Sequence, residues 1–227
     1  MSDAAAARQA ALDLLPDGAE VFTASSVTAD AIGLTQEIDS SGRYTATRPM
    51  LMAMDPATQM GEMRRLGAAP QWVVGSVHAL THNGDLVIAS ASGSQLASMA
   101  YGAQNVLLII GAQKIFPDLD TAMRRVHEYS LPLEDARARS AYGMSSTVHK
   151  VLTLHGDIEE GRVRVVLVDE PLGFDPPDPR RKTPPMTPPL IGQVALVAGA
   201  RPSEAELGVE DGMPPGYFPE ELFPEVT

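Results

Sequence analysis

Two short polar segments have the composition of anion-binding loops. Residues 25–28, Ser-Ser-Val-Thr, follow one apolar run, and residues 91–95, Ala-Ser-Gly-Ser-Gln, follow another. Each precedes a segment with helical character, and the start of a helix presents unpaired N–H groups and a partial positive charge. The candidate ligand-binding residues are Ser25, Ser26, Thr28, Ser92, Gly93, Ser94 and Gln95. The alternative interpretation is that these hydroxyls only cap helices.

Two charged residues are candidates for acid–base chemistry. Lys114 follows the apolar run 105–110, where its ammonium can neutralise a phosphate or carboxylate, act as a base if desolvated, or simply lie in solvent. Glu134 begins a predicted helix that also contains Arg137. It is a candidate general base or covalent carboxylate, as in a coenzyme A transferase-like mechanism, but the simpler interpretation is an ion pair along the helix.

Metal and cofactor chemistry have little support in the sequence. His78 and His82 are four residues apart, but they flank a predicted turn, so a helical metal-ligand spacing does not apply. We expect surface or supporting histidines and no metal site. The chain has no cysteine, so it offers no cysteine ligands for an iron–sulfur cluster and no disulfide, which fits a cytoplasmic location. A Gly-x-Ser-x-Gly elbow is also missing, so a serine hydrolase is not predicted.

The elements that must position these residues alternate between strands and helices. Strands are expected at residues 19–24, 71–75, 85–89 and 105–110, and helices at residues 29–38, 55–67, 95–101 and 118–129. In the second helix Met60, Met63 and Leu66 form a stripe that we expect to face inward. This alternation predicts an α/β fold with an open, mostly parallel sheet flanked by helices, which binds ligands at the strand ends. Residues 150–154 and 162–169 are expected to form a late antiparallel hairpin.

The charge and proline distributions divide the chain. Of 227 residues, 44% are hydrophobic, which suffices for one α/β domain at residues 1–175. Residues 176–227 form a Pro-rich acidic tail, in which 191–197 can add a short strand and the aromatic residues near the C-terminus can dock on a subunit. The formal charge of −12 argues against nucleic-acid binding. No signal peptide and no long apolar span are expected.

Several blocks, taken in order, resemble the LUD domain, the family of lactate-utilisation protein C. The similar blocks are Ser25–Thr28 with Ile32-Gly33, Gly75-Ser76-Val77, Asn83-Gly84 leading into Ala91–Leu96, Gly111–Ile115 with Pro117-Asp118-Leu119, and Leu131–Asp135. The resemblance implies a fold similar to the sugar-phosphate isomerase (NagB/RpiA-like) and coenzyme A transferase superfamily. Two positions depart from the family pattern: His82 stands where a Glu is common, and His149 where an Asn is common.

Two classes of function follow from this resemblance. In the first, the chain binds a small anionic metabolite and is an accessory subunit for the oxidation of L-lactate to pyruvate, beside iron–sulfur proteins. In the second, it is a stand-alone isomerase or acyl-transfer enzyme acting on a sugar phosphate or thioester, with Lys114 and Glu134 as acid–base residues. Association of two copies through the acidic tail is compatible with either class.

Overall fold

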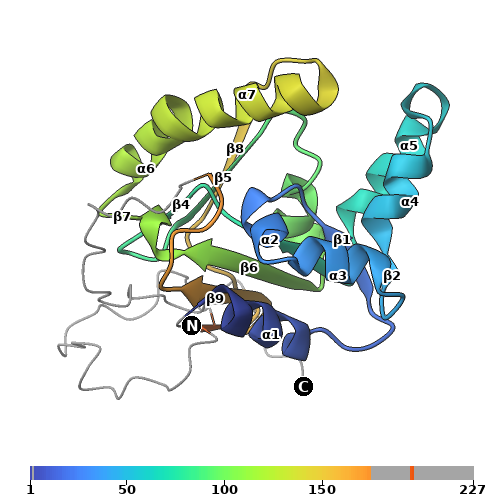
Figure 1. The fold of residues 1–227 in the computed structure, drawn as a ribbon, viewed down its shortest axis with the longest axis horizontal. Helices are drawn as coiled ribbons and strands as arrows, with labels where there is room; N and C mark the ends of the chain where they lie inside the picture. Colours follow the sequence, from blue (N-terminus) through green and yellow to red (C-terminus); the bar gives the residue numbers. More distant parts are fainter. Residues whose placement is uncertain (2, 175–194, 197–227) are drawn as a thin grey trace, which may run out of the picture.

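A parallel sheet of six strands, ordered β10-β9-β6-β3-β1-β2, forms the centre of the molecule (Figure 1). The computed structural model describes Met1, residues 3–174 and residues 195–196. Every pairing in this sheet is parallel. The strands are β1 (Glu20–Thr23), β2 (Thr45–Ala46), β3 (Trp72–Gly75), β6 (Asn105–Gly111), β9 (Val163–Val168) and β10 (Ala195–Leu196). The predicted α/β class with a mostly parallel sheet is therefore confirmed.

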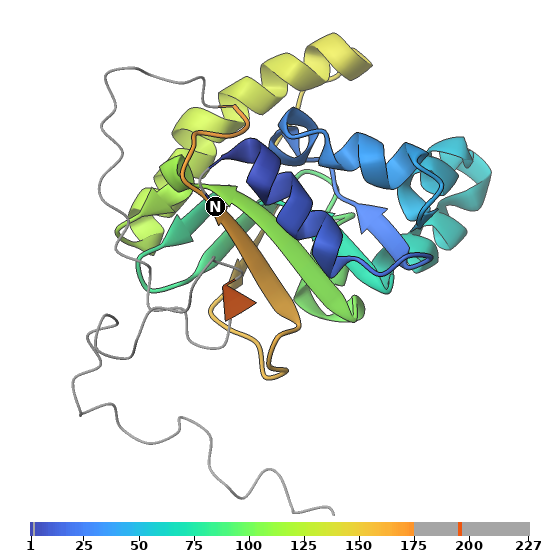
Figure 2. The same cartoon turned by 60° about the horizontal axis from the view of Figure 1, so that its bottom comes forward.

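One face of the sheet is covered by helices α1 (Ala4–Leu14), α2 (Val27–Ala31) and α3 (Leu34–Ser40) (Figure 2). Leu107 and Ile109 of β6 belong to the apolar cluster on this face, together with residues of α1. The predicted single helix over 29–38 is instead two helices. Gly33 separates them in a left-handed conformation with φ 70°, which ends the first helix and starts the second.

A second sheet covers the opposite face, ordered β7-β4-β5-β8. Its strands are β4 (Ala79–Thr81), β5 (Leu86–Ser90), β7 (Ile115–Phe116) and β8 (Lys150–Leu154). Leu108 and Ile110 of β6 pack in one cluster with Leu86 and Ile88 of β5. Neighbouring residues of β6 thus alternate between two buried faces, which explains why this strand is a continuous apolar run.

The predicted late hairpin is wrong. β8 pairs antiparallel with β5 in the second sheet, whereas β9 pairs parallel with β6 in the central one. The burial of the two strands shows the reason: β9 is buried along almost its whole length, while β8 is exposed at its start and only half-buried beyond. A strand buried on both faces belongs inside a covered sheet, so the chain crosses between sheets instead of turning back.

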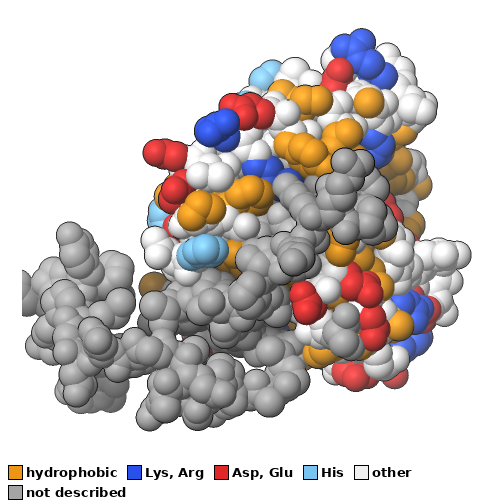
Figure 3. Space-filling model, turned by 60° about the vertical axis from the view of Figure 1, so that its left-hand side comes forward, with side chains coloured by type: hydrophobic (Ala, Val, Ile, Leu, Met, Phe, Trp, Pro, Cys, Tyr) orange, Lys and Arg blue, Asp and Glu red, His pale blue; other side chains and the backbone are white. Residues whose placement is uncertain are grey.

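The second sheet is covered on its outer side by one long helical segment. It consists of α6 (Leu119–Arg125), a π-turn (η3, Val126–Ser130) and α7 (Leu131–Tyr142), so the predicted helix over 118–129 runs farther than expected. Ala122 and Val126 pack on Val87 and Ala89 of β5. Figure 3 shows the side of the molecule that carries α6, where acidic, basic and apolar side chains are mixed rather than segregated.

Helices α4 (Thr47–Ala53) and α5 (Pro56–Ala68) project beside the central sheet (Figure 1). α5 begins as predicted, with Asp55 as the N-cap and Pro56 in the first turn. The predicted inward stripe is wrong at Met60, which is 40% exposed, because this helix packs mainly on α4 and leaves most of its surface in solvent. Among the described helices, none is long and apolar enough to cross a membrane.

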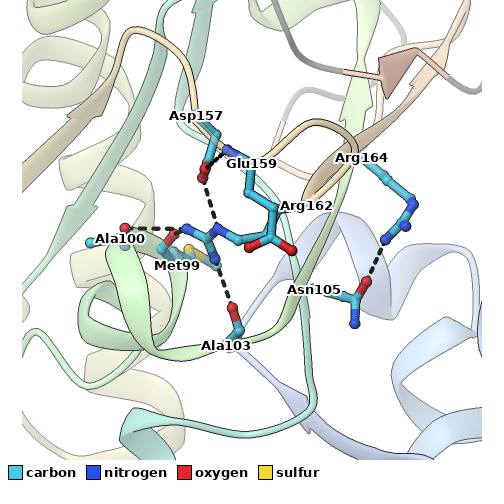
Figure 4. A network of polar contacts seen from close by, with 8 residues as sticks. All are labelled: Met99, Ala100, Ala103, Asn105, Asp157, Glu159, Arg162 and Arg164. Carbon is cyan, nitrogen blue, oxygen red and sulfur yellow. Dashed lines mark hydrogen bonds and ion pairs between the residues drawn. The ribbon is translucent and has the colours of Figure 1, made fainter. Parts of the chain in front are cut away.

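A buried arginine network holds a second π-turn, η1 (Ser98–Gly102), against the start of β9 (Figure 4). Arg162 is 6% exposed, and its guanidinium donates to the carbonyls of Met99, Ala100 and Ala103. Its Nε donates to Asp157 at 2.7 Å. Carbonyl groups at the end of a helical turn have no N–H partner within the turn, so the guanidinium supplies the missing donors. This network fixes the segment that follows residues 91–95.

Most of the expected tail lies outside the described residues. Within 176–227 the structure describes only β10, which pairs in parallel with β9 and falls inside the short strand expected at 191–197. The C-terminal residues that the sequence offers for docking, the aromatic Tyr217, Phe218 and Phe223 with Leu222, lie outside the described part of the chain.

Candidate functional site

A cavity of about 450 Å³ lies where the central sheet, the second sheet and α7 meet. It opens beside the carboxyl ends of β1 and β6, where an open parallel sheet presents its ligand loops. The structure brings together all but one of the predicted site residues along its wall: Ser25, Ser26, Thr28, Ser92, Ser94, Gln95, Lys114 and Glu134. Gly93 does not line the cavity. It has a positive φ of 84°, and its N–H donates to Ser90 Oγ, so it shapes the loop instead.

The loop at residues 25–28 is held by both side chains and backbone. Ser26 is the N-cap of α2 and accepts a hydrogen bond from the N–H of Ala29 at 3.2 Å. Ser25 Oγ accepts from Arg48, whose other terminal nitrogen donates to the carbonyl of Thr23. Arg48 also lines the cavity, so this loop brings one cationic side chain to the wall. Sequence reasoning missed Arg48, because the arginine lies on a different helix, α4.

Lys114 lines the cavity and is 8% exposed. Its Nζ donates to Thr28 Oγ1 at 2.8 Å, Ser76 Oγ at 2.9 Å and the carbonyl of Val77 at 3.0 Å. Those two hydroxyls donate in turn to backbone carbonyls of other segments. An ammonium can donate in three directions, and these contacts hold Nζ in one place. The side chain is therefore a fixed positive charge tied to both the loop at 25–28 and the end of β3.

The loop at residues 90–95 folds largely upon itself. Ser90 and Ser94 each contact Oε1 of Gln95 through their hydroxyl groups, and Ser92 Oγ accepts from the N–H of Ser94. Lys150 of β8 donates to the carbonyl of Ser92. The helix expected at 95–101 is present at 96–102, where two α-helical residues lead into the π-turn η1, but the expected serine cap is not formed: Ser92 bonds ahead of the helix and no side chain caps η1. This loop offers hydroxyl and amide groups to the cavity, but not the dipole of a long helix.

Glu134 is engaged by Arg137 in a two-bond ion pair. Arg137 Nε and its terminal nitrogen donate to the two carboxylate oxygens at 2.8 and 2.7 Å. This bond raises the pKa of Arg137 above its ordinary value. The ion pair expected along this helix is therefore formed, and Asp135 pairs in the same way with Arg139. A carboxylate held on both oxygens is a weaker base and nucleophile than an unbonded one, and the geometry favours a structural role for Glu134.

His78 and Arg125 are two cavity residues that the sequence did not identify. Nδ1 of His78 accepts a hydrogen bond from the N–H of Ala89, and Arg125 Nε donates to the carbonyl of His78. The Arg125 guanidinium lies over the rings of Phe116 and Tyr129. Desolvation, together with the nearby charges of Lys114 and Arg125, lowers the pKa of His78 to about 4. His78 is therefore neutral near pH 7.

The charges along the wall favour an anion. The described residues that line the cavity include two carboxylates, those of Asp30 and Glu134, of which the second is already paired. The cationic side chains of the wall are Arg48, Lys114, Arg125 and Arg137. A cavity with more cationic than anionic groups, in a chain whose formal charge is −12, concentrates positive potential in one place.

The remaining histidines and acids do not gather into a metal site. The described residues contain no group of three histidine, aspartate or glutamate side chains placed to hold a metal ion. His82 and His149, the two positions that depart from the family pattern, are both exposed and lie outside the cavity wall. Their difference from the pattern therefore changes no group that lines this cavity.

The parallel sheet, with loops and cationic side chains converging at its strand ends, defines an α/β domain with a ligand cavity. The model of the LUD domain matches residues 1–168, about three quarters of the sequence, and the chain belongs to that family. Membership associates the chain in general terms with lactate utilisation. No curated protein matches the chain in sequence.

Among solved structures, the crystal structure of eIF2B beta from Chaetomium thermophilum is one match. It is 14% identical, with a TM-score of 0.33, and the alignment covers 51% of this chain and 43% of that one.

Proposed function

We propose that this LUD-domain protein binds a small anionic metabolite, phosphorylated or carboxylated, in the cavity at the strand ends. The observation that carries the proposal is the placement of Lys114. Its buried Nζ lies on the cavity wall and is oriented by hydroxyls of two separate segments. Three arginines border the same space. Taking a charged group out of water is costly, so cationic side chains gathered around a cavity favour a ligand of opposite charge.

The size of the cavity narrows the ligand class. Cavities of roughly 300–1,000 Å³ hold metabolites and cofactors, and this one is about 450 Å³. That volume accommodates a sugar phosphate, and it exceeds the needs of a three-carbon acid alone. Hydroxyl-bearing side chains from both loops, such as Ser26 and Ser94, line the wall and suit a ligand that carries hydroxyls beside its charge.

The role that fits this chain within lactate utilisation is that of an accessory subunit beside iron–sulfur proteins. A chain without cysteine offers no thiolates for a cluster of its own, so electron transfer would depend on partner chains. The pairing of Glu134 with Arg137 supports this role over a transferase with a carboxylate nucleophile. The expected result is co-purification of acid-labile sulfide and iron with the chain when lactate-oxidation proteins are co-expressed. A chain that converts sugar phosphates or thioesters unaided would contradict the accessory role.

Ligand binding is tested by thermal shift of the full chain against inorganic phosphate, pyruvate, L-lactate, glucose 6-phosphate and coenzyme A. A ligand present at about 100 times its dissociation constant adds about 2.7 kcal/mol to the free energy of unfolding, which raises Tm by several degrees. We expect at least one anion to stabilise the wild-type protein.

The matched variants for this test are Ser26→Asp and Arg65→Gln. Aspartate is as good an N-cap as serine, so Ser26→Asp keeps the start of α2 while adding a negative charge to the cavity wall. Arg65→Gln lowers the net charge by the same amount on the exposed surface of α5, outside the cavity. We expect the first variant to lose the anion-induced shift and the second to keep it. Equal shifts in both variants would place binding elsewhere.

A further inference from the structure

The imidazole of His78 is the cavity side chain that the proposed anion site leaves unexplained. His78 lies between β3 and β4, next to the carbonyl of Val77 to which Lys114 donates. The ring lines the cavity. The ring is titratable and lies near the charges of Lys114 and Arg125. A protonated ring would repel these cations, whereas a neutral ring can bind the same anion beside them.

Hydrogen bonding fixes which nitrogen of this ring carries the hydrogen. Ala89 N–H donates to Nδ1 at 3.1 Å, so Nδ1 is the acceptor and the hydrogen of a neutral ring is on Nε2. This bond joins the residue before β4 to β5, because Ala89 lies in β5, and it holds the ring in one orientation. Nε2 makes no hydrogen bond with the described residues. Because the ring lines the cavity, its Nε2–H is the group that His78 can offer to a ligand there.

The surroundings keep the ring neutral. Lys114 approaches from the turn after β6 and Arg125 from α6, and both disfavour an imidazolium between them. Glu134, the carboxylate on α7, is bonded to Arg137 and does not offset this effect. A neutral ring whose Nδ1 is already used can only donate, and it does so at any pH above about 5.

We propose that His78 donates a hydrogen bond from Nε2 to an acceptor oxygen of the anion bound in this cavity, and so positions the ligand between Lys114 and Arg125. The inference rests on the proposed function, because it needs an anion in the cavity. Lys114 and Arg125 attract the anion through their charge. The uncharged ring of His78 determines where one oxygen of the anion lies. The ligand class is therefore an oxyanion with an unprotonated oxygen at that point, such as a phosphoryl or 2-oxo carboxylate group.

Two substitutions separate this contact from a structural role. Asparagine can place its carbonyl oxygen near the position of Nδ1 and so keep the bond from Ala89, but it cannot reach the position of Nε2. Glutamine can place its amide nitrogen near Nε2 but gives up the Nδ1 acceptor. The experiment measures the dissociation constant of the anion that most stabilises the wild type, among phosphate, pyruvate and glucose 6-phosphate, for the full-length wild type, His78→Asn and His78→Gln.

We expect His78→Asn to keep a Tm near that of the wild type and to bind the anion about tenfold more weakly or worse, as for a lost hydrogen bond to a charged group. We expect His78→Gln to have a lower Tm but to recover most of the affinity. Nitrogen-15 NMR of the wild-type histidine should show Nε2 protonated and Nδ1 unprotonated at pH 6.

Three results would overturn the inference. Wild-type affinity in His78→Asn would show that His78 only holds Ala89, and an Nδ1-protonated ring would remove the geometry on which the contact depends. A wild-type protein that binds none of the anions would overturn the proposed function and, with it, this contact. The first two results leave the proposed function standing, so the two failures are distinguishable.

Discussion

Two buried cations in this molecule, Arg162 and Lys114, are held in similar ways but lie in different settings. Each is under 10% exposed, and each donates to backbone carbonyls. Arg162 also bonds the carboxylate of Asp157 and lies between packed elements, away from the cavity (Figure 4). Lys114 bonds two hydroxyls and lines the cavity. Arg162 is therefore a cation that stabilises the fold, whereas the positive charge of Lys114 also acts on the cavity.

The difference shows that burial of a charge does not by itself identify a functional site. Both side chains are far from the average for their residue types, which are mostly exposed. They differ in their surroundings: Arg162 bonds a carboxylate between packed elements, whereas Lys114 lines a cavity of about 450 Å³. Four tests probe this distinction, starting with the largest expected effect.

Substitution of Arg162 by Met is expected to cost the fold the most. It leaves Asp157, whose side chain is 12% exposed, without its cation and removes the donor to three carbonyls. Breaking a buried pair in this way costs about 3–5 kcal/mol in the free energy of unfolding, which urea denaturation will measure. The folded fraction should bind the anion with wild-type affinity. If the affinity for the anion falls in proportion to the lost stability, then anion binding depends on Arg162 and Lys114 together.

Acid is expected to weaken the fold through His78. The pKa of this group is about 4 in the folded protein, below its ordinary 6.5, so the unfolded chain binds more protons between these values. Stability conferred by the neutral ring is complete above pH 6.5 and is lost as the pH falls toward 4, by up to ~3 kcal/mol. Denaturation at pH 7 and pH 4.5 measures the loss, and His78→Asn should lack this part of it. An identical pH dependence in that variant would assign the loss to other groups.

Substitution of Lys114 by Met is expected to affect both stability and binding. The acceptors Thr28, Ser76 and Val77 lose a charged donor, which costs about 2 kcal/mol in the free energy of unfolding. Unlike Arg162→Met, this variant should also lose anion-induced stabilisation. The measurement is a thermal shift with and without the anion. If the destabilised variant still shows the full anion-induced thermal shift, Lys114 only stabilises the fold, as Arg162 does.

Substitution of Glu134 by Gln is expected to change stability least. The pair with Arg137 is about one-third exposed on each side, and pairs of this kind contribute roughly 0–1 kcal/mol. Without the carboxylate of Glu134, the positive charge of Arg137 is no longer neutralised. The anion should therefore bind slightly more tightly, as measured by titration calorimetry. Weaker binding in Glu134→Gln would instead indicate that this carboxylate contacts the ligand directly.

The sequence predicted the central sheet and the side chains at its strand ends for a clear physical reason. A strand buried on both faces is a continuous apolar run, and parallel strands present their carboxyl ends along one edge, so Thr28 and Lys114, which each follow such a run, belong at the same edge. The structure places them 2.8 Å apart, between Oγ1 and Nζ. Predicting that these two residues meet requires only the local sequence patterns and the rule that parallel strands end at the same edge of a sheet.

The second sheet and the cavity residues it contributes were not predictable in the same way. β5 is fully buried, and a short buried strand has the same pattern whether its partners are parallel or antiparallel. His78 was missed because its role depends on the register between β4 and β5, which places Ala89 N–H opposite Nδ1. Arg125 lies in the predicted helix 118–129, but its place on the cavity wall and over the rings of Phe116 and Tyr129 comes only from packing.

The π-turn between α6 and α7 gives the outer wall of the cavity one place that can absorb a change in chain length. A π-turn holds one more residue than an α-turn, and such insertions often accompany functional sites. Deleting one residue between Val126 and Ser130 would convert the π-turn into an α-turn, so α7 would keep the face that carries Arg137 on the cavity wall. Deleting one residue within α7 ahead of Arg137 has no such bulge to absorb it and would rotate the residues that follow by ~100° about the helix axis. The wall of this cavity therefore tolerates a lost residue at the π-turn but not one turn farther along the same helix.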